Sequence, residues 1–233
     1  MSLDYLISVA QLCRDVYQRT PNTERLDILG IHHFKAGGDY GCAYVSPDTV
    51  YVTIAGSDDP VDWMSNFQTL LRADWYGISA HRGFVRAAKA LEDAMLAVLN
   101  HYPVHSMVFT GHSRGGAIAL LLAISAEINL PMRRGSRCIT FGQPRVSTAS
   151  QVRLAYRYGE YVRVENGADF VCRWPKLGYS HAGTCLYIRK SGGHEIDPSP
   201  LAQLRDRAFS LWSRGQDHRM TDYIQELKKC AQL

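Results

Sequence analysis

Ser113 stands between two glycines in the stretch TGHSRGGA at 110–117, and a serine in this setting could serve as a nucleophile. A short apolar segment precedes the stretch and a long helical pattern follows it, so Ser113 falls on the turn between a strand and a helix. Gly111 and Gly115 remove side chains that would collide across such a turn. The pattern therefore predicts a hydroxyl that projects from the end of a strand toward an electrophilic carbon.

A serine hydroxyl is a poor nucleophile near neutral pH, so it needs a base and an acid that orients the base. In a strand–turn–helix architecture of this type, the acid and then the histidine follow the serine in the chain. Asp169 lies just beyond a predicted strand, where α/β sheets carry their sites, and His218 precedes the last predicted helix. The residues left open as alternatives are Glu165 and Asp197 for the acid, and His181 and His194 for the base.

Strands and long helices must alternate to position these residues. Apolar segments bounded by Gly, Asp or Pro predict strands at 26–34, 40–47, 49–56, 106–110, 136–142, 161–166 and 184–190. Helical periodicity predicts helices at 1–18, 81–102, 114–130, 199–214 and 218–230. The central alternation favours an α/β fold with a mainly parallel sheet covered by helices on both faces, and the consecutive early strands favour an antiparallel edge.

Length and composition favour one domain that spans residues 1–233. The 233 residues are 46% hydrophobic, enough for one sizeable core, and no repeat or linker-like stretch divides them. Lys and Arg number 26 against 22 Asp and Glu, and the net charge of +4 is spread along the chain, so nucleic-acid binding is not expected. The longest apolar run, at 117–126, is too short to span a bilayer.

The cysteines and the N-terminus bear on metal binding and location. The six cysteines are widely scattered and form no metal-binding cluster with histidine, so we expect reduced core thiols and no metal. Residues 1–18 lack the features of a cleaved secretory signal, so the cytoplasm is the default location, with release by a route that needs no cleaved signal left open. The oligomeric state is not determined by any pattern.

Six motifs in order, between about Tyr40 and Tyr223, resemble those of the class 3 lipases, a fungal-lipase-like family of α/β hydrolases. The motifs are TIAGSDDPVDWMSNFQ at 53–68, HRGF at 81–84, TGHSRGGA at 110–117, TFGQPRV at 140–146, ADFVCRWPKLGYSHAGTCLYI at 168–188 and DHRMTDYI at 217–224. The resemblance implies the α/β-hydrolase fold and a catalytic triad. In that triad Ser113 is the nucleophile, Asp169 the orienting acid and His218 the general base.

The same resemblance implies an oxyanion hole and a lid. The backbone N–H groups of Ser57 and Arg114 would be the oxyanion donors, and a lid would occupy about 58–70. The lid residues singled out are Asp62, Trp63 and Asn66. No metal or organic cofactor is implied.

Three positions depart from the family pattern, namely Ala55, Arg114 and Cys172. Arg114 replaces the usual leucine, and its guanidinium could pair with the lid acids Asp58, Asp59 or Asp62, or receive an anionic group of the substrate.

The expected activity is hydrolysis of carboxylic esters, above all lipid esters of the triacylglycerol type, through an acyl-enzyme. The implied partner is the lipid or other ester substrate, with transient contact at a lipid interface. The alternatives on the same triad are a phospholipase A and a small-ester esterase. A catalytically silent domain that binds a lipid or a partner is the alternative from another class.

Overall fold

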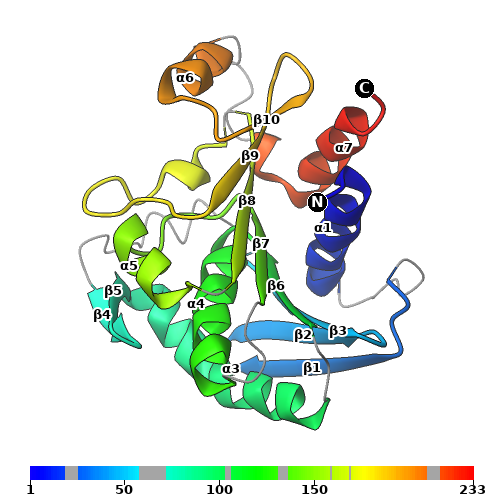
Figure 1. The fold of residues 1–233 in the computed structure, drawn as a ribbon, viewed down its shortest axis with the longest axis vertical. Coiled ribbons are helices and arrows are strands. Elements are labelled where there is room, and N and C mark those ends of the chain that lie inside the picture. The colour runs from blue at the N-terminus through cyan, green and yellow to red at the C-terminus, as the bar shows by residue number, and fades with distance from the viewer. Residues whose placement is uncertain are drawn as a thin grey trace.

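The computed structural model describes residues 1–18, 26–57, 72–102, 106–130, 136–157, 159–167, 169–208 and 216–233. An eight-stranded sheet forms its centre, with the strand order β1-β2-β3-β6-β7-β8-β9-β10 (Figure 1). The strands are β1 (Gly30–Ala36), β2 (Asp39–Val45), β3 (Thr49–Ile54), β6 (Ser106–His112), β7 (Arg137–Phe141), β8 (Glu160–Asn166), β9 (Thr184–Ile188) and β10 (His194–Ile196). Strands β3, β6, β7, β8 and β9 run parallel to one another, whereas β1, β2 and β10 pair antiparallel with their neighbours.

Helices cover both faces of this sheet, as the sequence predicted. The helices are α1 (Leu3–Gln18), α3 (Arg82–His101), α4 (Arg114–Asn129), α5 (Ala149–Ala155), α6 (Pro200–Ala208) and α7 (Met220–Cys230). Helices α3 and α4 pack in one apolar cluster on one face, and α1 and α7 lie side by side in a second cluster on the other (Figure 1). The two clusters take alternate residues of a strand, since Val50 and Val52 belong to the first and Tyr51 to the second.

Several short elements were not predicted from the sequence, among them the helix α5. A separate hairpin joins β4 (Arg72–Trp75) to β5 (Ile78–His81), and the three-residue β10 adds a second antiparallel edge to the sheet. The hairpin is held by the buried Trp75, whose indole N–H donates to the main-chain oxygen of Leu121 in α4 at 2.8 Å. Strands of three or four residues carry too little alternation to be recognised, so tertiary contacts decide them.

The cysteines behave as the sequence predicted, because all six thiols are unpaired and buried. In the part of the chain that the structure describes, no helix is long and apolar enough to cross a membrane. The same residues contain no group of three or more His, Cys, Asp or Glu side chains arranged to hold a metal ion.

Candidate active site

Ser113 occupies the sharp turn between β6 and α4. Its backbone has φ = 56° and ψ = −131°, a strained conformation for a residue with a side chain. A Cβ atom on Gly111 would lie 2.5 Å from the carbonyl carbon of Gly115, and one on Gly115 would lie 2.3 Å from the main-chain oxygen of Ile54. Only glycine fits at both positions, so the two glycines permit the close approach of β6, α4 and the end of β3.

Ser113, His218 and Asp169 form one chain of hydrogen bonds at the carboxyl ends of the parallel strands. The Oγ atom of Ser113 is 2.9 Å from Nε2 of His218, and Nδ1 of His218 is 2.8 Å from Oδ2 of Asp169. The carboxylate oxygen only accepts, so Nδ1 carries the proton and Nε2 is free to accept from the serine hydroxyl. The structure thus brings together the three residues that the sequence analysis named, from the turn after β6, the segment after β8 and the 3-10 turn Gln216–His218.

The carboxylate of Asp169 is held by three donors. Besides Nδ1 of His218, the hydroxyl of Tyr223 donates to Oδ2 at 2.7 Å, and the backbone N–H of Val171 donates to Oδ1 at 2.9 Å. Burial, followed by the charge of Asp169, raises the pKa of Tyr223 well above its usual value, so its hydroxyl stays protonated and can donate. These donors orient the carboxylate that in turn orients the imidazole.

A hydrogen bond and an ion pair anchor the turn that carries His218 to the adjacent sheet. The side-chain amide of Asn166 donates to the main-chain oxygen of Asp217 at 3.1 Å, and the buried carboxylate of Asp217 forms an ion pair with the partly exposed Lys190. Gly142, at the end of β7, leaves room for the triad: a Cβ atom there would lie 2.9 Å from Oδ2 of Asp169 and 3.2 Å from the ring of His218. The triad is therefore built into a packed, hydrogen-bonded scaffold.

The two expected oxyanion donors lie on neighbouring strand ends. Ser57 follows β3, and Arg114 is the first residue of α4, which follows β6, the parallel neighbour of β3. The first N–H groups of a helix have no acceptor within the helix, so the amide of Arg114 can bind an external oxygen. The close fit of Gly115 against Ile54 and Ala55 holds the start of α4 against the loop that leads to Ser57.

The guanidinium of Arg114 has a partner that the sequence analysis did not consider. It forms an ion pair with Asp39, the first residue of β2, whose side chain is only 8% exposed. The lid acids considered as partners, Asp58, Asp59 and Asp62, lie outside the described residues, as do Trp63, Asn66 and the whole expected lid at 58–70.

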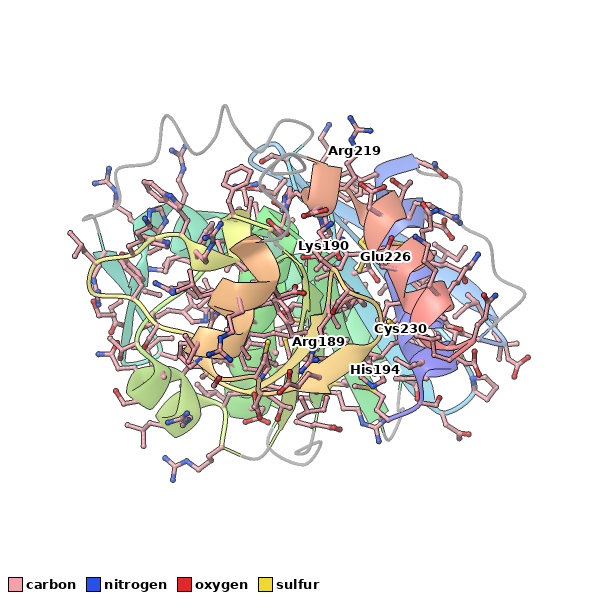
Figure 2. The ribbon with its side chains drawn as sticks, turned by 90° about the horizontal axis from the view of Figure 1, so that it is seen from above. Arg189, Lys190, His194, Arg219, Glu226 and Cys230 are labelled. Carbon is pink, nitrogen blue, oxygen red and sulfur yellow. The ribbon has the colours of Figure 1, made fainter. Side chains whose placement is uncertain are left out.

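The alternative acids and bases are engaged elsewhere. Glu165 is ion-paired with Arg163, and the carboxylate of Asp197 accepts from the backbone N–H of Cys185 at 2.7 Å. His181 donates through Nε2 to the main-chain oxygen of Cys172, and burial lowers its pKa well below 6.5. His194 lies exposed on β10, well apart from Arg219, the residue next to His218 (Figure 2).

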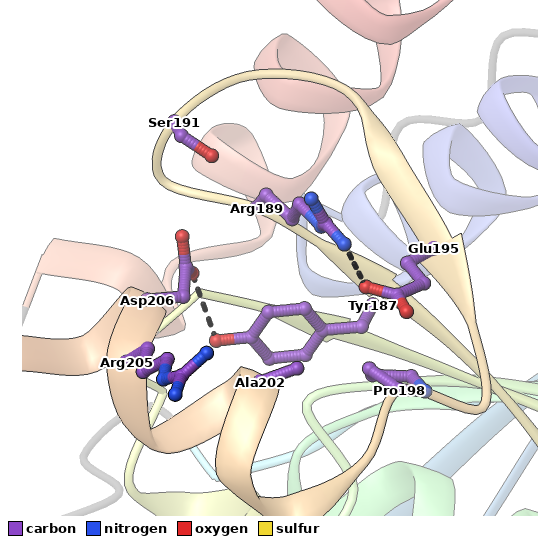
Figure 3. Close-up of a pocket in the computed structure, with 8 residues that line it drawn as sticks. All are labelled: Tyr187, Arg189, Ser191, Glu195, Pro198, Ala202, Arg205 and Asp206. Carbon is purple, nitrogen blue, oxygen red and sulfur yellow. Dashed lines mark hydrogen bonds and ion pairs between the residues drawn. The ribbon is translucent and has the colours of Figure 1, made fainter.

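A separate hollow of about 260 Å³ lies between the β9–β10 hairpin and α6 (Figure 3). Its charged groups are largely satisfied, because Arg189 pairs with Glu195 and Asp206 accepts from the hydroxyl of Tyr187 at 3.0 Å. No triad residue lines this hollow.

Sequence reasoning missed Tyr223 and Gly142 as members of the site. The sequence pattern indicates a core residue of an amphipathic helix at Tyr223 and an ordinary residue at a strand end at Gly142. Tyr223 lies 54 positions from Asp169, and no local pattern predicts a contact at that separation. The only available signal was their occurrence within the motifs TFGQPRV and DHRMTDYI.

Comparisons with known proteins identify the family of this chain. Residues 51–179, more than half of the chain, match the family "Lipase (class 3)". A lipase of Rhizomucor miehei is 28% identical over 61% of this chain and 42% of its own length. A phospholipase A1-II 1 of Oryza sativa subsp. indica is 30% identical over 61% of this chain and 37% of its own length. The chain thus spans less than half of these two relatives.

The solved structure of the Rhizomucor miehei triacylglyceride lipase shares the fold. It superposes with a TM-score of 0.68 and 23% identity, over 80% of this chain and 78% of the neighbour.

Proposed function

Because the chain belongs to the class 3 lipase family, we propose that it hydrolyses carboxylic esters of lipids through an acyl-enzyme on Ser113. The observation that carries this proposal is the continuous hydrogen-bonded chain from Oγ of Ser113 through His218 to Asp169, with Ser113 in the strained turn. A catalytically silent domain would have no need for this complete arrangement.

The geometry supports the following steps. Nε2 of His218 accepts the proton of Ser113 while Oγ attacks the ester carbonyl, and the backbone amides of Ser57 and Arg114 donate to the developing oxyanion. His218 then returns the proton to the leaving alcohol, and water repeats the sequence to release the acid. Asp169 keeps Nδ1 of His218 protonated and stabilises the imidazolium that forms in each half-reaction.

We favour neutral acylglycerols as the main substrate class. The guanidinium at the start of α4 could have received a phosphate, but Asp39 already compensates the charge of Arg114. An anionic head group would therefore meet a paired cation there. A phospholipase A1 activity is the second candidate, and the similarity to the rice phospholipase A1-II 1 supports it.

Hydrolysis of nitrophenyl esters of increasing chain length, emulsified triacylglycerol and phospholipid vesicles tests the proposal. We expect triacylglycerol to be cleaved faster than phospholipid, and Ser113→Ala to lose at least about a thousandfold in turnover because triad members act as a unit. A fluorophosphonate should label wild type and leave Ser113→Ala unlabelled. The matched control is Ser125→Ala, which removes a buried hydroxyl from α4, about 18 Å along the helix from Ser113. Equal activity in the two serine variants would contradict the assignment.

We further propose that the segment at 58–70 acts as a lid at a lipid interface. The support is the resemblance of residues 53–68 to the lid stretch of the family, and the full burial of Ser113 agrees with a site that opens for its substrate. Activity should rise sharply when the substrate passes its solubility limit, and micelles should change the tryptophan fluorescence of wild type but not of Trp63→Phe. A smooth saturation curve across that limit would contradict the lid.

A further inference from the structure

Tyr17, the penultimate residue of α1, is linked to the triad through His112. The Oη atom of Tyr17 is 3.1 Å from Nδ1 of His112, and Nε2 of His112 is 2.6 Å from the main-chain oxygen of His218. A carbonyl oxygen only accepts, so Nε2 of His112 carries a proton and donates it. Burial lowers the pKa of His112 well below 6.5, so the ring is neutral and its Nδ1 accepts from the Tyr17 hydroxyl. The two hydrogen bonds therefore have a fixed direction, from α1 to the backbone of His218.

The same hydroxyl lies against the loop that carries the other expected donor. A Cβ atom on Gly56 would lie 2.2 Å from Oη of Tyr17 and 2.6 Å from the main-chain oxygen of His112. Gly56 immediately precedes Ser57, the expected oxyanion donor. One side chain of α1 thus touches both the expected oxyanion loop and the residue that binds the backbone of His218.

The groups that face His112 explain why its ring must not take a second proton. The ring of His218 lies 4.6 Å from that of His112 between centroids, Tyr223 of α7 lies 5.9 Å away, and Tyr17 faces it from α1. His218 becomes positively charged when it takes the serine proton, and a second positive charge on His112 would oppose that transfer. The Tyr17 hydroxyl occupies the nitrogen at which the second proton would bind.

We propose that Tyr17 and His112 are positioning residues, which hold the main chain of His218 and keep a neutral ring beside it. This inference rests on the proposed ester hydrolysis. It makes the N-terminal helix part of the active-site structure, although α1 contributes no residue of the triad.

The test compares turnover of a soluble nitrophenyl ester in Tyr17→Phe, His112→Leu and His112→Gln. Loss of one orienting hydrogen bond should lower kcat of Tyr17→Phe about tenfold with KM nearly unchanged. Loss of the donor to His218 should lower kcat of His112→Leu about a hundredfold, as expected for a small misplacement of a reacting group. The amide N–H of His112→Gln can donate to the same oxygen, so this variant should recover part of the loss.

The matched control is Tyr156→Phe, which removes a buried hydroxyl bonded to Ser136 at 2.8 Å on the other face of the sheet. It should lower the melting temperature as Tyr17→Phe does while kcat stays at the wild-type value. A Tyr17→Phe variant that is destabilised yet keeps kcat within about twofold would overturn the inference, because a hydrogen bond without a catalytic role costs only stability.

If wild type hydrolyses no ester, the proposed function fails, and the rate at which a fluorophosphonate labels Ser113 still measures the activation of the serine. A slower rate in Tyr17→Phe than in Tyr156→Phe supports the positioning role, and equal rates contradict it.

Discussion

The hydroxyl of Tyr223 donates to Oδ2 of Asp169 at 2.7 Å, the same oxygen that binds the imidazole of the triad. The tyrosine comes from α7 and the aspartate from the segment after β8, so the contact joins the last helix of the chain to the sheet. The position of the triad acid thus depends on how α7 packs.

Tyr223→Phe should lower kcat about tenfold, because Asp169 loses one of the donors that orient it. The free energy of unfolding of the variant should also be about 1.5–3 kcal/mol lower than that of wild type, which is the usual contribution of a hydrogen bond to a charged group. Urea denaturation and ester turnover check the two effects. Tyr156→Phe should lose stability alone; a Tyr223→Phe variant with wild-type kcat would mean that Val171 and His218 suffice to hold the acid.

Gly142→Ala should impair both turnover and stability. Gly142 has φ = 57°, and its added methyl group would lie 2.9 Å from Oδ2 of Asp169, so the acid and the imidazole must both move. Gly37→Ala is the matched control, since Gly37 has φ = 58° and its methyl group would make only ordinary contact with Ala90. Both variants should lose about 1 kcal/mol or more of unfolding free energy through backbone strain. Only Gly142→Ala should lose activity, and equal activity losses would show that strain alone is responsible.

Arg114→Leu should be more destabilising than the double variant Arg114→Leu/Asp39→Leu. The single change leaves the buried carboxylate of Asp39 without its cation, whereas the double change removes both charges. Urea denaturation of the four members of this cycle measures the coupling. Turnover of a neutral short ester should stay within a few fold in both variants, because the backbone N–H of residue 114 remains. A large loss on that ester would mean that the guanidinium shapes the oxyanion hole.

The unfolding free energy should decrease as the pH falls from about 7 toward 5. Burial holds the pKa of His112 and His181 well below 6.5, so below that pH the unfolded chain binds protons that the folded chain does not. Each such histidine can change the unfolding free energy by up to about 1.4 kcal/mol per pH unit. His181→Gln keeps a donor for Cys172 and removes the titration, so its stability should fall less steeply with acid. A stability that falls as steeply with acid in His181→Gln as in wild type would contradict this prediction.

The amino-acid sequence by itself determined the features that depend on short-range sterics and periodicity. The glycines around Ser113 specify the sharp turn, and the change from apolar strand to helical pattern specifies the elements on either side of it. These signals operate within a few residues, so they can be read without knowing how the chain packs.

Only the tertiary structure decided the distances and the supporting contacts. Ser113 and His218 are 105 positions apart, and their contact at 2.9 Å forms only when the strand ends meet at one edge of the sheet. The local sequence does not predict the hydrogen-bond partners of Tyr17, His112 and Tyr223, because a partner in a packed core depends on which helices cover the sheet. Packing of α1 and α7 on one face brings these side chains to the triad, and periodicity predicts the helices but not what they touch.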